Sequence, residues 1–292
     1  MSSFVPMNSN LQSATRSVLS QFSEVANITF NETSPGSADI NFGTGALAVN
    51  GYSFTAGITY FGWNNSSDAS YSWLTGANVY LTTAGIAGYS TAAPGDEAYE
   101  TLVHEVGHAL GLGHPHDDIQ LSSTYDSNKY TVMSYNQQQE AGAFGTARLV
   151  LGLQMVDILA IQHLYGAASS TRDGATTYGF NSTETGVFNF ETTFNNNGIR
   201  PPSIAIYDTG GIDTLDLSGY SAHQTISLVQ ETFSSIGDNT NTGDATDALV
   251  NLISIARGTV IENAVGGSGN DTITGNSADN IITGGTGNDI LN

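Results

Sequence analysis

Three of the six histidines in this chain lie within eleven residues, in the segment TLVHEVGHALGLGHP at positions 101–115. His104 and His108 are four positions apart. On a helix this spacing places both imidazoles on one face, so both could reach a single metal ion at roughly 2.0–2.1 Å. Gly111 allows the chain to leave the helix through a left-handed turn, which brings His114 back as a third ligand. The segment therefore predicts a zinc site made by these three histidines.

Glu105 is the neighbour of the first predicted ligand. It projects in an adjacent direction, too displaced to be a further ligand in the same plane, and can instead hold a metal-bound water and accept its proton. Three neutral histidines leave the charge of the ion largely uncompensated, which lowers the pKa of the bound water. An open coordination position can polarise a peptide carbonyl. We therefore expect metal-assisted hydrolysis with Glu105 as the catalytic base.

The composition limits the partners of the chain. Its 292 residues can bury one large core or two ordinary ones. Six Lys+Arg face 27 Asp+Glu, for a formal net charge of −21, which argues against nucleic acid and anionic membranes as partners. The chain has no cysteine, which excludes a disulfide framework. No apolar run is long enough for membrane insertion, and residues 1–12 do not read as a Sec-type signal peptide.

Periodicity predicts a helix and then a sheet ahead of the histidine segment. Residues 11–26 place apolar side chains on one helical face, with Asn8 and Ser9 as candidate caps. Alternating apolar positions between Gly, Asn and Ser turns predict strands of one sheet at 26–30, 38–42, 57–61 and 78–82.

Two further helices are expected. Residues 94–97 open the helix that carries the histidines, with acids in its first turn, and it should end near Gly111. The other covers about 153–165 and is closed by Gly166. Beyond this point helical spacing disappears, and short apolar pairs alternate with Gly, Asp, Asn and Thr. A domain boundary is therefore expected between 166 and 178.

The last 27 residues form three blocks of nine: GGSGNDTIT (266–274), GNSADNIIT (275–283) and GGTGNDILN (284–292). The first and third fit G-G-x-G-x-D-x-U-x, the repeat of the calcium-binding parallel β-roll. The middle block departs from it at Asn276, Ala278 and Asn280.

This repeat predicts a metal-dependent fold. Its glycines permit tight turns, and Asp271 and Asp289 offer carboxylate oxygens to calcium held between successive turns. Without calcium the aspartates would repel one another across a small core, so folding should depend on the metal. A disordered tail is the alternative, against which the fixed phasing argues. The apolar residues expected to stack into a thin core are Ile273, Ile281, Ile282, Ile290 and Leu291.

A methionine segment, TVMSY at 131–135, follows the zinc motif. The pattern H-E-x-x-H-x-x-G-x-x-H followed by a Met-turn is that of the metzincins. Its five fixed positions would arise by chance on the order of once in 100,000 such chains. By this resemblance Met133 forms the hydrophobic floor beneath the zinc.

Pro115 after the third histidine, Tyr135 after the Met-turn and the nonapeptides together resemble the serralysins, calcium-dependent zinc endopeptidases exported by bacteria. Astacins share a Met-turn tyrosine but typically carry cysteines. Segments that resemble the serralysin family are 24–30, 157–167, 177–182, 207–220 and 260–271.

The resemblance implies an α+β metzincin catalytic domain at 1–170 and an all-β parallel β-roll (RTX) domain at 171–292, with the nonapeptides at 266–292. It implies that Tyr135 is a further zinc ligand that swings away to hydrogen-bond the oxyanion. Substrate would lie extended along an exposed edge strand, for which GITYF (57–61) is the candidate. His116, Asp117 and Asp118 form a polar cluster near the metal, which we interpret as a solvent-facing loop.

Calcium positions are also carried over from the family. Arg172 and Gly174 would give backbone carbonyls, and Thr176 a further oxygen. The remaining calcium residues implied are Asp208, Gly210, Gly211, Asp213 and Glu262 beside the first turns of the roll, and Gly267, Gly269, Asp271, Gly285, Gly287 and Asp289 in the nonapeptides.

We therefore expect a secreted, extracellular bacterial zinc endopeptidase that acts on protein or peptide substrates, with a proteinaceous inhibitor as a further partner and a monomeric state. Export would not use a cleaved Sec signal peptide. The family's early strand, N-terminal propeptide and terminal export signal are not found, which predicts a fragment of a larger protein or unusual ends. The alternatives are a calcium-binding adhesive or matrix module, and a catalytically silent protease-like binding domain.

Overall fold

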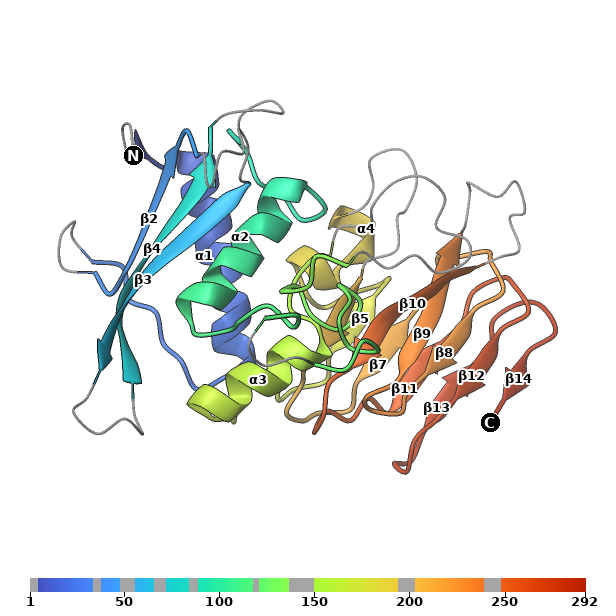
Figure 1. Ribbon diagram of the computed structural model, residues 1–292. Coiled ribbons are helices and arrows are strands. Elements are labelled where there is room, and N and C mark those ends of the chain that lie inside the picture. The colour runs from blue at the N-terminus through green and yellow to red at the C-terminus, as the bar shows by residue number, and fades with distance from the viewer. Residues whose placement is uncertain are drawn as a thin grey trace.

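The structure is a computed structural model (Figure 1). The residues that it describes are 5–33, 38–47, 56–65, 72–83, 89–117, 121–136, 150–193, 203–238 and 248–292. Within these residues, no helix is long and apolar enough to cross a membrane.

The N-terminal part pairs a twisted sheet with two helices, α1 and α2, that lie on one side of it (Figure 1). The strands of this sheet run in the order β1-β2-β4-β3, with β2 parallel to β4 and β3 antiparallel to β4. Among the described strands, β3 therefore has a neighbour on one side only. The bounds are β1 Val5–Pro6, β2 Ile40–Gly45, β3 Gly57–Asn65 and β4 Ser72–Thr82.

Three of the four predicted strands are confirmed, and the prediction of a strand at 26–30 is wrong. Ala26 makes an isolated bridge with Ala167, and no strand follows. The alternation in this segment reflects packing, because Ile28 and Phe30 lie partly buried against the core without pairing to the sheet. Alternating burial along a segment therefore does not by itself show that the segment pairs with a sheet.

Helix α1 (Ser9–Val25) begins at Asn8, whose side chain accepts a hydrogen bond from the Leu11 amide at 3.0 Å. This cap satisfies one of the amides that the first turn leaves without a partner. The helix buries Val18 and Phe22 completely, in the core that it shares with α2 and the sheet. The sequence prediction of this helix is confirmed.

Helix α2 (Glu97–Ala109) and helix α3 (Met155–Tyr165) both end at glycines in the left-handed region. Gly111, two residues beyond α2, has φ +100°, and Gly166, the C-cap of α3, has φ +82°. Residues with a Cβ rarely adopt these angles, so glycine allows each helix to stop where the chain must turn. The two predicted helices are thus confirmed, with α3 starting two residues later than expected.

The C-terminal part is a roll of short, mostly parallel strands that follows α3 (Figure 1). One sheet runs in the order β13-β11-β7-β5 and the other in the order β14-β12-β8-β9-β10-β6. The bounds are β5 Thr177–Gly179, β6 Ile204–Ile206, β7 Thr214–Asp216, β8 Thr225–Ser227, β9 Phe233–Asp238, β10 Ala248–Ile255, β11 Asn263–Val265, β12 Thr272–Thr274, β13 Ile281–Thr283 and β14 Ile290–Leu291. A 3-10 turn at Gly186–Phe188 and the short helix α4 (Phe190–Thr193) pack beside them.

The nonapeptides wind as predicted, with two blocks for each full turn of the roll. Strand β11 pairs in parallel with β13, and β12 with β14, each partner lying 18 residues further along the chain. The predicted order of an α+β part followed by a parallel β-roll is confirmed.

The prediction of a shared apolar core in the nonapeptides is correct only in part. Ile273 is fully buried and Ile282 is partly buried against the roll core. Ile281 and Ile290 are exposed, because strand alternation directs the neighbours of the inward residues to the outer face. Leu291 is half exposed in the last turn.

Phe22→Ala tests the core beneath α1. Removing a fully buried phenyl ring leaves a cavity, so we expect the free energy of unfolding of the N-terminal part to fall by about 3–5 kcal/mol. Urea unfolding followed by circular dichroism measures this change. The matched control is Ser13→Ala on the exposed face of the same helix, expected to change stability by about 0.5 kcal/mol or less. Equal effects of the two substitutions would contradict the assignment of the core face.

Candidate metal centre

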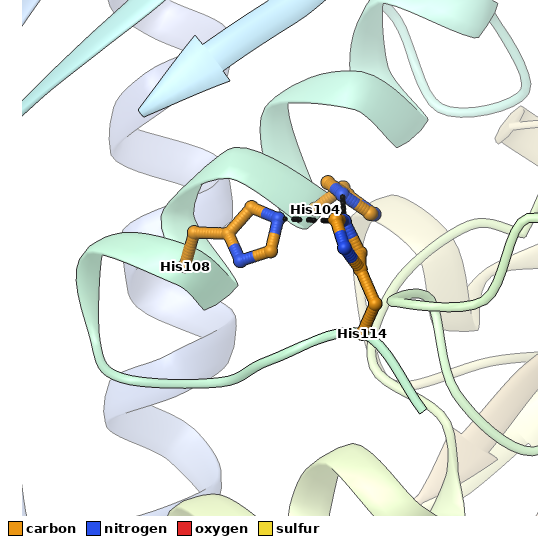
Figure 2. A group of neighbouring side chains, drawn as sticks. All are labelled: His104, His108 and His114. Atoms are coloured by element: carbon orange, nitrogen blue, oxygen red, sulfur yellow. Dashed lines mark hydrogen bonds between the residues drawn. The ribbon is translucent and has the colours of Figure 1, made fainter. Parts of the chain in front are cut away.

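Three imidazole rings converge at the C-terminal end of α2 (Figure 2). His114 Nε2 lies 3.2 Å from His104 Nε2 and 3.0 Å from His108 Nε2. Tetrahedral zinc with nitrogen ligands at roughly 2.0–2.1 Å separates those nitrogens by about 3.3 Å. Both distances are therefore close to the spacing that a single zinc ion imposes, and the three histidines, whose ligand atoms lie within 4.8 Å of one another, form a group that could hold a metal.

Each ring is oriented by a partner on its other nitrogen. His104 Nδ1 lies 2.9 Å from the Val132 carbonyl and His108 Nδ1 lies 2.8 Å from the Leu112 carbonyl. A carbonyl can only accept, so both Nδ1 atoms carry the proton and donate it, which leaves the Nε2 lone pairs directed at one point. Lone pairs facing one another at such short distances repel, and a cation between them removes that repulsion. The donor set thus fits a divalent metal.

Burial keeps the first two rings in the form that binds a metal. Burial lowers the pKa of His104 to about 3, and the neighbouring His108 contributes further. Burial also lowers the pKa of His108. Both imidazoles are therefore neutral near neutral pH, as metal ligands must be.

The third ring is oriented by a carboxylate. Asp117 accepts a hydrogen bond from His114 Nδ1 at 2.7 Å. Asp117 is exposed, as the prediction of a solvent-facing loop requires, yet it also orients His114. His116 stacks parallel to the His114 ring at a centroid distance of 5.2 Å. Asp118 lies outside the described residues.

Met133 is 2% exposed and packs against α2 beside His108. Its sulfur packs so closely on α2 that a Cβ at Gly107 would come within 2.7 Å of Sδ. Glycine at position 107 therefore permits the close approach of the methionine segment to the helix. This geometry is the one expected of a floor below the metal.

Tyr135 closes the group from the solvent side. Its hydroxyl lies 2.8 Å from His114 Nε2, and its ring stacks on His104 at a centroid distance of 5.6 Å. The residue is 66% exposed, so its ring has room to move away. The phenol oxygen thus lies within reach of an ion held by the histidines and of a group bound there.

Glu105 is 5% exposed and lies against strand β3. The Thr59 hydroxyl donates to Glu105 Oε2 at 2.6 Å. Burial raises the pKa of Glu105 to about 7, while the hydrogen bond from Thr59 lowers it. A carboxylate with this pKa can both take up and release a proton near neutral pH.

Asp157 anchors the methionine segment from the first turn of α3. Its carboxylate accepts from the Thr131 hydroxyl at 2.5 Å, from the Val132 amide at 2.8 Å and from the Gln154 amide at 2.9 Å. Burial raises the pKa of Asp157 to about 6, with the three donors acting against the rise. Because the Val132 carbonyl accepts from His104 Nδ1, Asp157 orients a predicted metal ligand through one intervening residue, Val132.

Thr59 and Asp157 are residues of the site that the sequence did not predict. Thr59 lies within the predicted strand GITYF, but alternation alone does not say which helix its inner face meets. Asp157 stands at the third position of α3, where a capping box was a readable signal. The contacts of Thr59 with Glu105 and of Asp157 with Val132 join residues that are distant in the chain, so residue spacing does not reveal them.

A second group of predicted residues meets at the entrance of the roll. Asp213 Oδ1 accepts from the Thr176 amide, and the Asp213 amide donates to Glu262 Oε2, each at 2.7 Å. Burial raises the pKa of Asp213 to about 7, and the charges of Asp208 and Glu262 raise it further. Asp213 Oδ2 is buried without a hydrogen-bond partner among the described residues.

Backbone oxygens border this acidic group. A Cβ at Gly211 would lie 2.4 Å from the Gly174 carbonyl oxygen and 2.8 Å from Asp213 Oδ1. The Gly210 amide donates to Asp208 Oδ1 at 2.8 Å. Carboxylates and carbonyls packed together in this way are the ligands that calcium prefers.

Arg172, predicted to lend a calcium its carbonyl, has a positive φ of 55° and turns its side chain to other groups. The guanidinium contacts Glu24 of α1, Glu184 and the Tyr207 carbonyl. It also lies 4.4 Å from the ring centroid of Phe188. This side chain therefore joins α1 to the start of the roll.

Glycine carbonyls stack in the nonapeptide turns. A Cβ at Gly285 would lie 1.9 Å from the Gly267 carbonyl oxygen, and a Cβ at Gly287 would lie 2.0 Å from the Gly269 carbonyl oxygen. Any side chain there would enter the space of the turn before it. The predicted glycine positions are thus adjacent between successive turns.

The nonapeptide aspartates have backbone donors. Asp271 accepts from the amides of Gln224 and Gly267 at 2.8 and 2.7 Å, and Asp289 Oδ1 accepts from the Asp271 amide at 2.9 Å. In the middle block, Asn280 donates to the Glu262 carbonyl at 2.8 Å. These amide donors offset part of the repulsion between the aspartates without a metal, and the dependence of folding on calcium stays a prediction.

Comparison with known proteins covers both parts of the chain. Residues 11–162 match the family described as "Metallo-peptidase family M12B Reprolysin-like", and residues 167–292 match the one described as "Peptidase M10 serralysin C terminal".

Curated relatives match over nearly the whole chain. Metallopeptidase AprA of Pseudomonas marginalis is 36% identical over 296 residues, which cover 97% of this chain and 57% of that protein. Serralysin G of Dickeya chrysanthemi is 36% identical over 300 residues, covering 96% and 56%. Serralysin of Proteus mirabilis is 36% identical over 285 residues, covering 91% and 54%. The chain spans about half the length of these relatives.

Asp157→Asn tests the anchoring of the metal site. The amide group keeps one acceptor oxygen and turns an NH2 group toward donors that the carboxylate satisfied. We expect zinc affinity to fall about 10–100-fold, because the Val132 carbonyl and with it His104 lose their orientation. Competition with a chromophoric chelator measures the affinity. Asp39→Asn, at an exposed aspartate just before β2, removes the same charge and should leave zinc binding unchanged. Unaltered zinc affinity in Asp157→Asn would contradict the anchoring role.

Proposed function

Because the chain belongs to the reprolysin-like metallopeptidases and carries a serralysin C-terminal domain, we propose that it is a zinc endopeptidase that hydrolyses peptide bonds in proteins. One observation carries the proposal. The Nε2 atoms of His104 and His108 lie 3.2 and 3.0 Å from His114 Nε2, and an exposed phenol lies beside them, with a buried glutamate next to His104 in the helix; this is the donor set of a hydrolytic zinc site. The resemblance to serralysins inferred from the sequence is confirmed.

His104, His108 and His114 would hold the ion. When bound, zinc supplies positive charge that acidifies water and polarises the substrate carbonyl. Glu105 would accept a proton from the attacking water and return it to the leaving nitrogen. Its burial supports this role, because a carboxylate with a raised pKa holds the proton between the two transfers.

Tyr135 would act on the substrate carbonyl. Its hydroxyl, 2.8 Å from His114 Nε2, is positioned to donate a hydrogen bond to the oxygen on which negative charge develops. A donor that meets its acceptor only as charge develops lowers the barrier without tightening the ground state. The exposure of the ring supports a role that needs movement.

Strand β3 would bind the substrate backbone. The Thr82 amide donates to the Ala56 carbonyl, and the register pairs Ile58 with Tyr80. Hydrogen-bonded pairs alternate along an antiparallel ladder, so the backbone groups of Thr59 and of its alternate neighbour Gly57 face the open edge. An extended peptide could pair there, next to Glu105, as the prediction for GITYF requires.

Calcium would bind first at the entrance of the roll. Asp208, Asp213 and Glu262 lie together there, and the buried Asp213 Oδ2 lacks a partner within the described residues. A cation would satisfy this oxygen and offset the repulsion among the three carboxylates. The carbonyls of Arg172 and Gly174, Thr176 and the turn at Gly210–Gly211 would complete the ligands. Further calcium would bind between nonapeptide turns, at Gly267, Gly269, Asp271, Gly285, Gly287 and Asp289.

We place the boundary between the protease part and the roll at 170/171, and we propose that the enzyme acts outside the cell as a monomer. Protein substrates follow from the peptidase assignment, and a proteinaceous inhibitor is a further proposed partner. The names of the relatives, serralysin among them, support this setting.

Glu105→Gln tests the catalytic base. The amide preserves size but cannot accept the proton of the attacking water, so we expect kcat to fall about a hundredfold to ten-thousandfold. Casein cleavage by the zinc- and calcium-loaded protein measures the rate, and elemental analysis should find unchanged zinc. Glu97→Gln, at an exposed glutamate of the same helix, should retain full activity. Wild-type turnover in Glu105→Gln, or no cleavage by the parent protein, contradicts the proposed chemistry.

Calcium removal tests the roll. We expect a calcium-selective chelator to unfold residues 178–292 before the metal-binding part, since calcium at 100 times its Kd stabilises a fold by about 2.7 kcal/mol. Scanning calorimetry with and without calcium resolves the transitions. Asp213→Asn should reduce the calcium dependence by removing the site at the entrance of the roll, whereas Asp279→Asn, at an exposed aspartate in the middle block, should leave it unchanged. Melting that is indifferent to calcium would rule out the proposed sites.

A further inference from the structure

We infer that Thr59 is a positioning residue that fixes the Glu105 carboxylate and joins it to the substrate-binding strand; the inference rests on the proposed function. The Thr59 hydroxyl lies 2.6 Å from Glu105 Oε2 and 2.9 Å from the Glu105 carbonyl oxygen. It reaches across from β3 to α2, two elements whose contact the sequence does not reveal.

The carboxylate is the stronger acceptor of the two. A hydroxyl has one proton, so it can donate fully to only one of the two oxygens. The contact to Oε2 is the shorter, and a hydrogen bond to an ionised carboxylate is roughly twice as strong as one to a neutral carbonyl. Thr59 therefore holds Oε2 and leaves Oε1 for the attacking water.

The backbone of β3 restricts the same side chain from a second position. A Cβ at Gly57 would lie 2.7 Å from Glu105 Cγ and 2.9 Å from Glu105 Oε1. The glutamate thus lies directly against the strand where glycine leaves room for it. Because the packing limits its stem and Thr59 limits its head, the carboxylate is held in one orientation.

Thr59 also belongs to the open edge of the sheet. Its side chain faces α2, while its own amide and carbonyl face the side on which a peptide would pair. One residue therefore contacts the catalytic base through its hydroxyl and substrate through its backbone. The distance between the attacked bond and the base is set through this residue.

Thr59→Val and Thr59→Ser separate positioning from packing. Valine keeps the shape but removes the donor, so we expect kcat to fall about tenfold to hundredfold with KM unchanged within about twofold. Serine keeps the hydroxyl and should retain kcat within about threefold of the parent. Steady-state cleavage of a fluorogenic peptide by the full chain, loaded with zinc and calcium, gives both constants. Zinc content and melting temperature are measured on the same preparations, and kcat is referred to the zinc-loaded fraction.

A double-mutant cycle links the effect to Glu105. In the Glu105→Gln background, Thr59→Val should change the residual rate by less than about twofold, because no carboxylate remains to be positioned. Wild-type kcat in Thr59→Val overturns the inference, as do equal losses in the valine and serine variants or a full additional loss in the Glu105→Gln background. Wild-type turnover in Glu105→Gln alone contradicts the proposed function instead, so the two failures are distinguishable.

Discussion

Three nitrogen lone pairs directed at one point are the constraint on which the rest of this structure depends. Left alone they repel, so each ring must be held by a partner on its far side. The partners of His104, His108 and His114 come from the methionine segment, from the turn after α2 and from Asp117. Three hydrogen bonds thus hold the rings close together against the repulsion between their lone pairs. A bound cation would remove that repulsion.

Several of the many acidic side chains of this chain are buried in specific surroundings. Asp157 lies buried among amide donors, and Glu105 lies buried against a strand. At the entrance of the roll Asp213 is surrounded by like charges. Arg172 supplies a positive charge to two other acids. Its side chain contacts Glu24 of α1 and Glu184 of the roll and so joins the two parts of the chain. The roles of these charged groups therefore depend on their burial, and the same groups on a solvent-exposed surface would not have them.

Local interactions along the chain explain most of the structural elements that the sequence predicted correctly. Helical period, caps and glycine stops identified α1, α2 and α3, and fixed nine-residue phasing identified the turns of the roll. The prediction failed at 26–30, where alternating burial arises from packing of Ile28 and Phe30 and not from a strand. It failed again at Ile281 and Ile290, because the phasing does not say which side of a strand faces inward.

The sequence by itself determined which histidines could share a metal. The four-residue spacing of His104 and His108 on a helix and the left-handed conformation of Gly111 are both matters of local geometry. The sequence also determined that a glutamate stands beside these histidines. Tertiary structure alone decided that Thr59 holds that glutamate, that Asp157 binds Val132, the residue next to Met133, and that Asp213 meets Glu262. These pairs are separated by 25 to 49 positions in the chain, and only the packing of distant elements brings such residues within hydrogen-bonding distance.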